Sequence, residues 1–148
     1  MIAEKKRIAI LGSTGSIGTQ SLEVIAAHPD AFEVEVLTAQ QNASLLVEQA
    51  KRFKPNAVVI VNEEHYPFVK SQLSNTDVKV YTGENALSAV VQMDSVDLVL
   101  TALVGYSGLG PTIKAIEAGK PIALANKETL VVAGELITRL AHEKGVNI

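Results

Sequence analysis

The sequence predicts an α/β fold in which a doubly wound parallel sheet carries helices on both faces. Short apolar segments alternate with amphipathic segments of helical periodicity along the whole chain of 148 residues. The connections between these segments are short, which favours right-handed strand–helix–strand units and a parallel sheet. Aromatic residues make up only 4% of the chain, so Val, Leu, Ile and Ala must fill the core, as they do around buried parallel strands.

Each element of the first half has a local reason in the sequence. Residues 7–12, RIAILG, form an apolar run that ends in Gly, as expected of a buried strand. The helix that follows ends at His28-Pro29-Asp30, because Pro cannot continue a helix. Residues 32–39 alternate as a strand does, and Asn42 is the expected N-cap of an amphipathic helix over 42–53. Further strands are predicted over 56–61 and 78–83, with a helix over 63–74 between them.

The second half repeats the pattern with a strongly apolar strand, 96–103, followed by the glycine-rich turn VGYSGLGP. A helix over 112–119 comes next, and Gly119 is its expected C-cap. The apolar run VNI after Gly145 resembles the start of another strand, so we expect residues 1–148 to be one domain of a longer protein. The remaining predicted elements are helices over 84–93 and 127–144 and a strand over 121–125.

Composition and charge exclude several classes of function. The net charge is −3 and no basic stripe is present, so no nucleic acid partner is expected. No apolar run reaches about 18 residues, which argues against a membrane span. Because the first strand starts within seven residues, we expect no signal peptide. The chain has no Cys, which excludes disulfides, thiol nucleophiles and thiolate metal sites and agrees with a cytoplasmic location.

A glycine-rich turn, GSTGSIG, joins the first strand to the first helix and spaces Gly12, Gly15 and Gly18 three residues apart. A Rossmann-like fold binds a dinucleotide pyrophosphate at this position. We expect Gly12 to turn the chain, Gly15 to admit a phosphate to the backbone, and Gly18 to let the helix pack on the strand. The N–H groups around Ser16 and Ile17 then face the anion. The alternative is a tight strand-to-helix turn without a ligand. Hydroxyl groups that can assist are those of Ser13, Thr14 and Ser16.

The loop after the second strand, TAQQN, bears on the choice of cofactor. An NAD-binding unit usually ends its second strand with Asp or Glu, which holds the ribose 2′-hydroxyl. This chain has no carboxylate there, so a 2′-phosphate is permitted, and Gln40 and Gln41 can donate hydrogen bonds to it. The local chemistry therefore favours NADP over NAD, although the two Gln residues also fit an ordinary surface loop.

A second polar cluster, Asn126-Lys127-Glu128, follows the strand of residues 121–125. Ligands bind at this end of the strands in open α/β sheets, although Asn126 and Glu128 also fit an ordinary helix start. Together, ILGSTGSIGTQSLEVI and TALVGYSGLGPTIKAIEAGKPIALANKETLVVAG resemble the 1-deoxy-D-xylulose 5-phosphate reductoisomerase family. The similarity extends through most of the chain.

The resemblance implies an enzyme that rearranges and reduces 1-deoxy-D-xylulose 5-phosphate to 2-C-methyl-D-erythritol 4-phosphate, using NADPH and a divalent metal, Mg²⁺ or Mn²⁺. It also implies a homodimer that takes this small sugar-phosphate substrate in the non-mevalonate isoprenoid route. By the same resemblance, Lys127 contacts the substrate. The implied cofactor contacts are Thr14, Gly15, Ser16 and Ile17 at the pyrophosphate, Ala39, Gln40, Gln41 and Asn42 at the 2′-phosphate, and Asn126 and Glu128 near the nicotinamide.

The family's metal site, an Asp-Ser-Glu motif and a further Glu in a catalytic domain, would lie beyond Ile148. Residues 1–148 are therefore expected to bind the cofactor without catalysing the reaction, and to hold no metal site. The His residues of the chain are scattered in the sequence, at His28, His65 and His142. The family often has a basic step where this chain has Gln40-Gln41.

Three other interpretations remain at this stage. Tyr66 and Lys70 supply the Tyr-x-x-x-Lys pair of short-chain dehydrogenases, but they follow the third strand, so we interpret them as an exposed helix start at Pro67. A semialdehyde dehydrogenase cofactor domain shares the glycine spacing but needs a catalytic Cys. The third alternative is a nucleotide-sensing module without chemistry.

Overall fold

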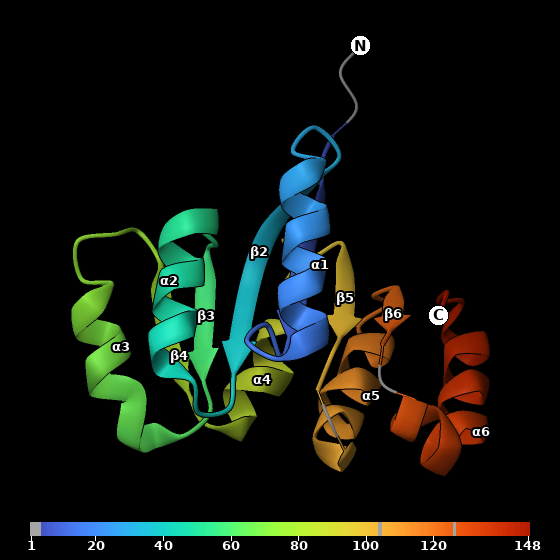
Figure 1. Ribbon diagram of the computed structural model, residues 1–148. Coiled ribbons are helices and arrows are strands. Elements are labelled where there is room, and N and C mark those ends of the chain that lie inside the picture. The colour runs from blue at the N-terminus through green and yellow to red at the C-terminus, as the bar shows by residue number, and fades with distance from the viewer. Residues whose placement is uncertain (1–3, 104, 126) are drawn as a thin grey trace.

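The computed structural model describes residues 4–103, 105–125 and 127–148, and for residues 105–106 and 127–132 it describes the main chain only. Within this part of the chain, six parallel strands form one sheet in the order β4-β3-β2-β1-β5-β6 (Figure 1). The strands are β1 (Lys6–Leu11), β2 (Phe32–Ala39), β3 (Ala57–Ile60), β4 (Lys79–Thr82), β5 (Leu98–Thr101) and β6 (Ile122–Leu124). The helices are α1 (Ser16–Ala27), α2 (Ala43–Phe53), α3 (Tyr66–Gln72), α4 (Glu84–Val90), α5 (Leu109–Glu117) and α6 (Lys127–Lys144), with short 3₁₀ turns η1 (Glu63–His65) and η2 (Gly105–Gly108).

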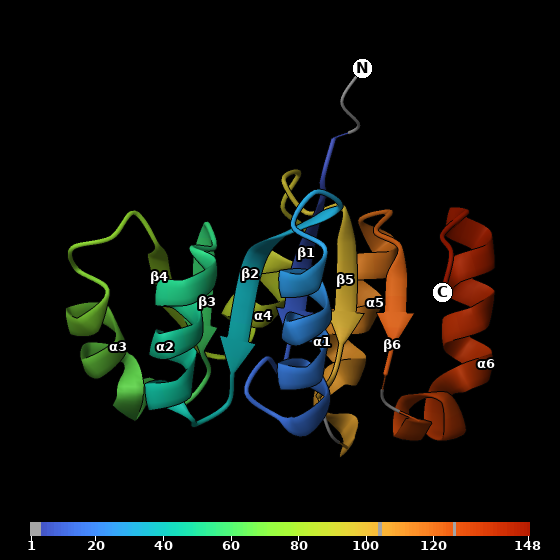
Figure 2. The ribbon, with the colours of Figure 1, turned by 45° about the horizontal axis from the view of Figure 1, so that its top comes forward.

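The helices divide between the two faces of the sheet, which confirms the doubly wound parallel fold. Figure 2 shows α1 and α2 in front of the sheet and α4 and α5 behind it. The side chains of β1 alternate between two buried clusters. Ile8 and Ile10 join the cluster on the side of α1, α2 and α3, whereas Ala9 and Leu11 join the cluster on the side of α4, α5 and α6. Aliphatic residues dominate both clusters, as the composition predicted.

Most predicted elements agree with the structure, and the differences are at their ends. The bounds of β2 and α6 match the prediction to the residue. Helix α5 begins at Leu109, earlier than expected, because Pro111 falls in its first turn, where the missing N–H costs no hydrogen bond. The segment predicted as a single helix over 63–74 is a 3₁₀ turn followed by α3.

The end of the chain differs from the prediction of a further strand. Gly145 has a φ of +67° and ends α6, as expected. The three residues after it form no strand in the structure. Their main chain lies beside β6, where the N–H of Ile122 donates to the carbonyl of Asn147 at 2.9 Å. This one hydrogen bond does not pair residues 146–148 with β6 as a strand of the sheet.

Candidate functional site

The glycine-rich turn lies at the point where the connections of the sheet change direction. The chain passes from β1 to β2 on one side, and it returns much later to β5 on the other side of β1. Both β2 and β5 pair with β1 in parallel, so the loops after all three strands meet at the carboxyl edge of the sheet. Open α/β folds bind their ligands in the crevice outside this edge.

Two glycines shape the turn for the reasons that the sequence suggested. Gly12 has a φ of +85°, which side chains disfavour, and a Cβ there would lie 3.0 Å from the carbonyl oxygen of Ala102. A Cβ at Gly18 would overlap with the carbonyl oxygen of Gly12 and lie 2.7 Å from the Cα of Ser13. The first turn of α1 therefore packs directly on the end of β1, and only Gly fits at position 18.

The exposed part of the turn leads into the N-terminus of α1. Gly15 is the N-cap, with extended backbone angles (φ −78°, ψ 177°), and no side chain caps the helix. The nearest atom to a Cβ at Gly15 would be the carbonyl oxygen of Gly12, at 3.9 Å, so this position is open. Thr14 is half-buried, and Ser16 and Ile17 are exposed. The first turn of α1 contains no acidic residue, so its N–H groups and positive dipole end are available to an anion.

Ser13 does not belong to this exposed surface, contrary to the prediction that its hydroxyl assists a ligand. It is fully buried, and its Oγ lies 2.7 Å from Oε1 of Gln49 and 3.1 Å from the carbonyl oxygen of Thr38. Its N–H donates to the same carbonyl at 2.8 Å. The side chain turns inward because every one of these partners lies on β2 and α2, beneath the turn.

Thr38 and Gln49 are residues that the sequence reasoning missed. Thr38 is fully buried near the end of β2, and its Oγ1 accepts a hydrogen bond from the N–H of Gly12 at 3.0 Å. Gln49 is 6% exposed and donates from Nε2 to the carbonyl of Ser13 at 2.9 Å. The available signal was a Gln on the apolar face of the helix over 42–53, beside Leu46 and Ala50.

The loop after β2 has the exposure that a ligand contact requires. Ala39 ends the strand and is buried, whereas Gln40, Gln41 and Asn42 are exposed. Oδ1 of Asn42 accepts from the N–H of Leu45 at 3.2 Å, which confirms its predicted role as the N-cap of α2. The carbonyl of Gln40 accepts from the N–H of Asn62, which ties the loop to the chain after β3. The loop therefore has a fixed main chain and free Gln side chains.

The second polar cluster is described only in part. Asn126 lies outside the described residues. The main chain of Lys127 and Glu128 begins α6 directly after β6, at the same carboxyl edge as the glycine-rich turn. Helix α6 has non-helical angles at Ala133 (φ −131°, ψ 16°), which separate its first segment from the part that packs through Ile137 on α5 and the sheet.

The loop after β5 is the second glycine-rich segment at this edge. Thr101 and Thr112 are fully buried, and their hydroxyl oxygens lie 3.2 Å apart. The hydroxyl of Thr112 also donates to the carbonyl of Gly108 one turn earlier in the chain. A Cβ at Gly108 would lie 3.0 Å from Cγ2 of Thr101, so the small residue lets this loop pack on the strand.

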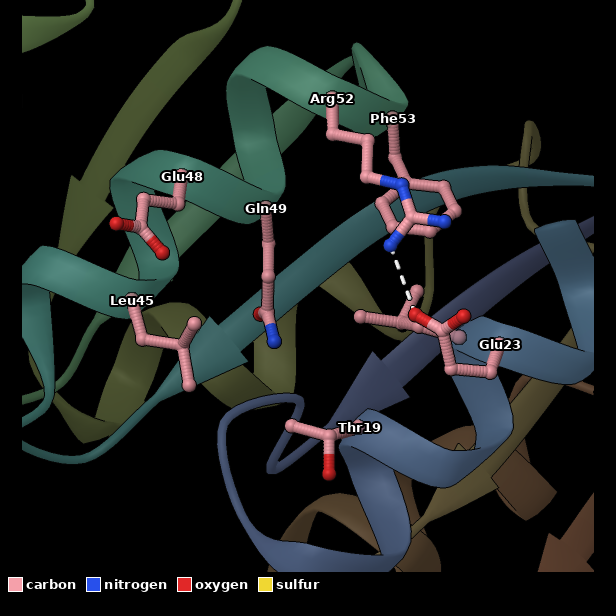
Figure 3. Close-up of a pocket in the computed structure, with 8 residues that line it drawn as sticks. Thr19, Glu23, Leu45, Glu48, Gln49, Arg52 and Phe53 are labelled. Atoms are coloured by element: carbon pink, nitrogen blue, oxygen red, sulfur yellow. Dashed lines mark hydrogen bonds and ion pairs between the residues drawn. The ribbon is translucent and has the colours of Figure 1, made fainter.

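A hollow of about 160 Å³ lies between α1 and α2, on one face of the sheet (Figure 3). Thr19 and Glu23 approach it from α1, and Gln49 and Arg52 approach it from α2. Arg52 donates to Glu23 across it at 2.8 Å. Ligand pockets are usually about 300–1,000 Å³. The hollow is thus too small for a dinucleotide and is a gap in helix packing.

At the opposite, amino edge of the sheet, Arg7 binds Asp97 and joins β1 to the start of β5. The main-chain N–H of Arg7 and its Nε donate to the same carboxylate oxygen, at 2.9 and 3.1 Å. The side-chain hydrogen bond from Arg7, followed by the main-chain hydrogen bond, lowers the pKa of the Asp97 carboxyl below its ordinary value. This pair stabilises the sheet and is remote from the candidate site.

Other candidate features contribute little to this edge. Tyr66 and Lys70 lie on α3, beside the β3–β4 end of the sheet and away from the glycine-rich turn (Figure 1). Among the described residues, no group of three or more His, Cys, Asp or Glu side chains is placed to hold a metal ion. Over the same residues, no helix combines the length and the apolar character needed to cross a membrane.

Comparisons with known proteins show which family the chain is similar to. The profile of the 1-deoxy-D-xylulose 5-phosphate reductoisomerase family matches residues 8–134. The curated relative from Phocaeicola vulgatus, named 1-deoxy-D-xylulose 5-phosphate reductoisomerase, is 63% identical over 139 residues, which cover 94% of this chain and 36% of that protein. The relative of the same name from Porphyromonas gingivalis is 56% identical, and the match covers 97% of this chain and 37% of that protein. The chain thus spans little more than a third of the length of the curated relatives it matches.

Solved structures give the same result. The Zymomonas mobilis reductoisomerase in complex with NADPH superposes with a TM-score of 0.92 at 36% identity, covering 97% of this chain and 38% of that one. A reductoisomerase in complex with NADPH, fosmidomycin and magnesium has a TM-score of 0.90 at 34% identity, with coverage of 95% and 35%. A homoserine dehydrogenase from Thiobacillus denitrificans, at 16% identity and a TM-score of 0.60, shares the fold.

Proposed function

The chain belongs to the 1-deoxy-D-xylulose 5-phosphate reductoisomerase family, and on that premise we propose that residues 1–148 form an NADPH-binding domain. The enzyme concerned converts 1-deoxy-D-xylulose 5-phosphate to 2-C-methyl-D-erythritol 4-phosphate in isoprenoid biosynthesis. The observation that carries this proposal is the uncapped N-terminus of α1, which opens beside Gly15 at the carboxyl edge of the sheet. A relative of similar fold binds NADPH, which supports the proposal.

The turn after β1 fits the pyrophosphate of the cofactor. The N–H groups at Gly15, Ser16 and Ile17 would bind its oxygens, and the hydroxyls of Thr14 and Ser16 would add hydrogen bonds. Because Gly15 has open space where a Cβ would be, phosphate oxygens can approach the main chain. Gly18 keeps this N-terminus against the end of β1, so the donors are held in place before the ligand arrives.

The loop of residues 39–42 would hold the adenosine 2′-phosphate. Gln40 and Gln41 are exposed amides that can donate to phosphate oxygens, and no carboxylate stands in the loop to repel them. Ala39 and Asn42 fix the two ends of this loop, one in β2 and the other at the N-cap of α2. The loop carries no positive charge, so we expect a preference for NADPH that depends on hydrogen bonds.

The segment after β6 would complete the site. We propose that Asn126 and Glu128 contact the cofactor near its nicotinamide and that Lys127 supplies a charge and hydrogen-bond donor to the sugar phosphate. When bound, NADPH supplies the hydride that reduces the substrate, and a divalent cation, Mg²⁺ or Mn²⁺, polarises the substrate's oxygens. We assign the metal ligands to a catalytic domain outside residues 1–148. We also propose that the complete enzyme is a cytoplasmic homodimer.

Calorimetric titration of the 148-residue chain with NADPH and with NADH tests this proposal. We expect NADPH to bind several-fold more tightly than NADH, and we expect the chain to show no turnover of 1-deoxy-D-xylulose 5-phosphate with added Mg²⁺. Replacing Gln40 and Gln41 by Ala should narrow the difference between the two cofactors, whereas Gln72→Ala on the exposed surface of α3 should not. Absence of NADPH binding would contradict the cofactor assignment, and equal affinities would contradict the role of the Gln pair.

A further inference from the structure

Gln49 stands out as a buried polar side chain whose hydrogen bonds all go to one residue of the glycine-rich turn. It is 6% exposed, and it lies on the face of α2 that is otherwise formed by Leu46, Val47 and Ala50. Its Nε2 donates to the carbonyl of Ser13 at 2.9 Å, and its Oε1 lies 2.7 Å from the Ser13 hydroxyl. One amide group thus binds both polar oxygens of Ser13, from 36 positions away in the chain.

Ser13 is the last residue of the turn before the exposed donors begin. Its N–H donates to the carbonyl of Thr38, so the N–H, the hydroxyl and the carbonyl of Ser13 are all hydrogen-bonded to β2 and α2. The direction in which the chain leaves Ser13 sets the direction of the peptide groups from Thr14 onward. Rotation of the Ser13 carbonyl, which Gln49 prevents, would turn the N–H of Thr14 with it, because the two belong to one planar peptide unit.

Direct packing between α1 and α2 is a weaker link than these hydrogen bonds. The hollow of about 160 Å³ separates the two helices beside Gln49 (Figure 3). The ion pair of Glu23 and Arg52 crosses this hollow, but the two side chains are 67% and 55% exposed. Exposed ion pairs contribute little, whereas leaving a buried carbonyl unpaired is costly. The two buried hydrogen bonds of Gln49 are therefore the strongest interaction described between α2 and the glycine-rich turn.

We propose that Gln49 is a positioning residue for the cofactor pyrophosphate, because it fixes Ser13 and with it the N–H groups that follow. This inference rests on the proposed binding of NADPH. It also links the two phosphate sites of that ligand through one helix. Asn42 is the N-cap of α2 and the last residue of the proposed 2′-phosphate loop, and Gln49 binds the pyrophosphate turn two helical turns later.

The chemistry of the contact fits glutamine. Its amide offers a donor to the Ser13 carbonyl and an acceptor to the Ser13 hydroxyl at the same time, without a charge. A Glu carboxylate would place a negative oxygen against that carbonyl, whereas a protonated Glu would restore both bonds. Burial and the facing carbonyl would raise the pKa of such a carboxyl.

The test compares a ligand that contains the pyrophosphate with one that lacks it. NADP⁺ is titrated by calorimetry, and adenosine 2′-monophosphate is titrated by heteronuclear NMR, which measures weak binding. For Gln49→Met we expect the affinity for NADP⁺ to fall about tenfold or more, because two buried hydrogen bonds are lost. Binding of adenosine 2′-monophosphate should change less than about twofold. Gln92→Met, which removes an exposed amide on the other side of the sheet, is the matched control.

A second arm uses Gln49→Glu over a range of pH. Relative to the wild type at each pH, its affinity for NADP⁺ should be low at about pH 8 and should recover towards about pH 5.5, as the buried carboxyl becomes protonated. Equal losses for both ligands, unchanged NADP⁺ binding in Gln49→Met, or a flat pH profile in Gln49→Glu would overturn the role of Gln49. Failure of the wild type itself to bind NADP⁺ would instead overturn the proposed function.

Discussion

The two glycine-rich loops at the carboxyl edge differ in how far along the chain the side chains that bind them lie. The turn after β1 is held by Thr38 and Gln49, which are 26 and 36 positions away from the residues they bind. The loop after β5 is held by Thr112, which bonds to Gly108 and Thr101 within 11 positions. The two loops also touch, because a Cβ at Gly12 would lie 3.0 Å from the carbonyl of Ala102. The first loop therefore takes its shape from the assembled sheet, and the second takes its shape from its own helix.

The strongest test of this difference is Gly18→Ala. A methyl group there would overlap with the carbonyl of Gly12, so α1 would have to move away from β1. We expect a loss of more than about 3 kcal/mol in the free energy of unfolding and the loss of NADPH binding. Urea denaturation and calorimetric titration measure the two effects.

Gly110→Ala is the matched control for that substitution. Gly110 lies in the first turn of α5, and a Cβ there would meet no atom within 4 Å. Its stability should stay the same or rise by up to about 1 kcal/mol, because Ala favours a helix more than Gly does. Comparable stability of the two variants would show that the close packing of Gly18 on Gly12 and Ser13 is not needed for folding.

An intermediate effect is expected from Thr38→Val, compared with Thr112→Val. Each substitution keeps the shape of a buried side chain and removes its hydroxyl, so each should cost about 1–3 kcal/mol of stability. They should differ in NADPH affinity. Thr38→Val leaves the N–H of Gly12 without its partner and should weaken binding, whereas Thr112→Val should change it little. If both variants bind NADPH equally well, the long-range support of the first loop has no functional role.

The smallest effect concerns the amino edge, where Arg7 and Asp97 join β1 to β5. The pKa of Asp97 is lowered in the folded state, so its contribution to stability is present above its unfolded pKa of about 3.9 and is lost as the pH falls through the folded value. Asp97→Asn should lower the Tm by no more than about 3 °C at neutral pH, because the pair is partly exposed. The difference from the wild type should shrink as the pH falls below the unfolded pKa and vanish below the lowered folded pKa, as thermal unfolding at several acid pH values will show. A difference that stays constant through this acid range would contradict the role of the charge.

The sequence predicted the fold well because its signals were local. The apolar run of β1, the cap at Asn42 and the positive φ of Gly145 each depend on a few neighbouring residues. The structure corrected Ser13, whose hydroxyl turns inward, because this orientation depends on Thr38 and Gln49. No pattern within the glycine motif carries that information. For the same reason, the sequence alone does not say what a Gln on an apolar helix face binds.

During synthesis on the ribosome, residues 6–82 are made before any residue of β5. Those residues suffice for the half-sheet β4-β3-β2-β1, in which β1 is an edge. The main-chain groups on this edge of β1 stay unpaired until β5 forms. The side chains of Ala9 and Leu11 stay exposed until the helices of the other face pack on them. The strand at the centre of the finished sheet is thus an edge strand until β5 pairs with it.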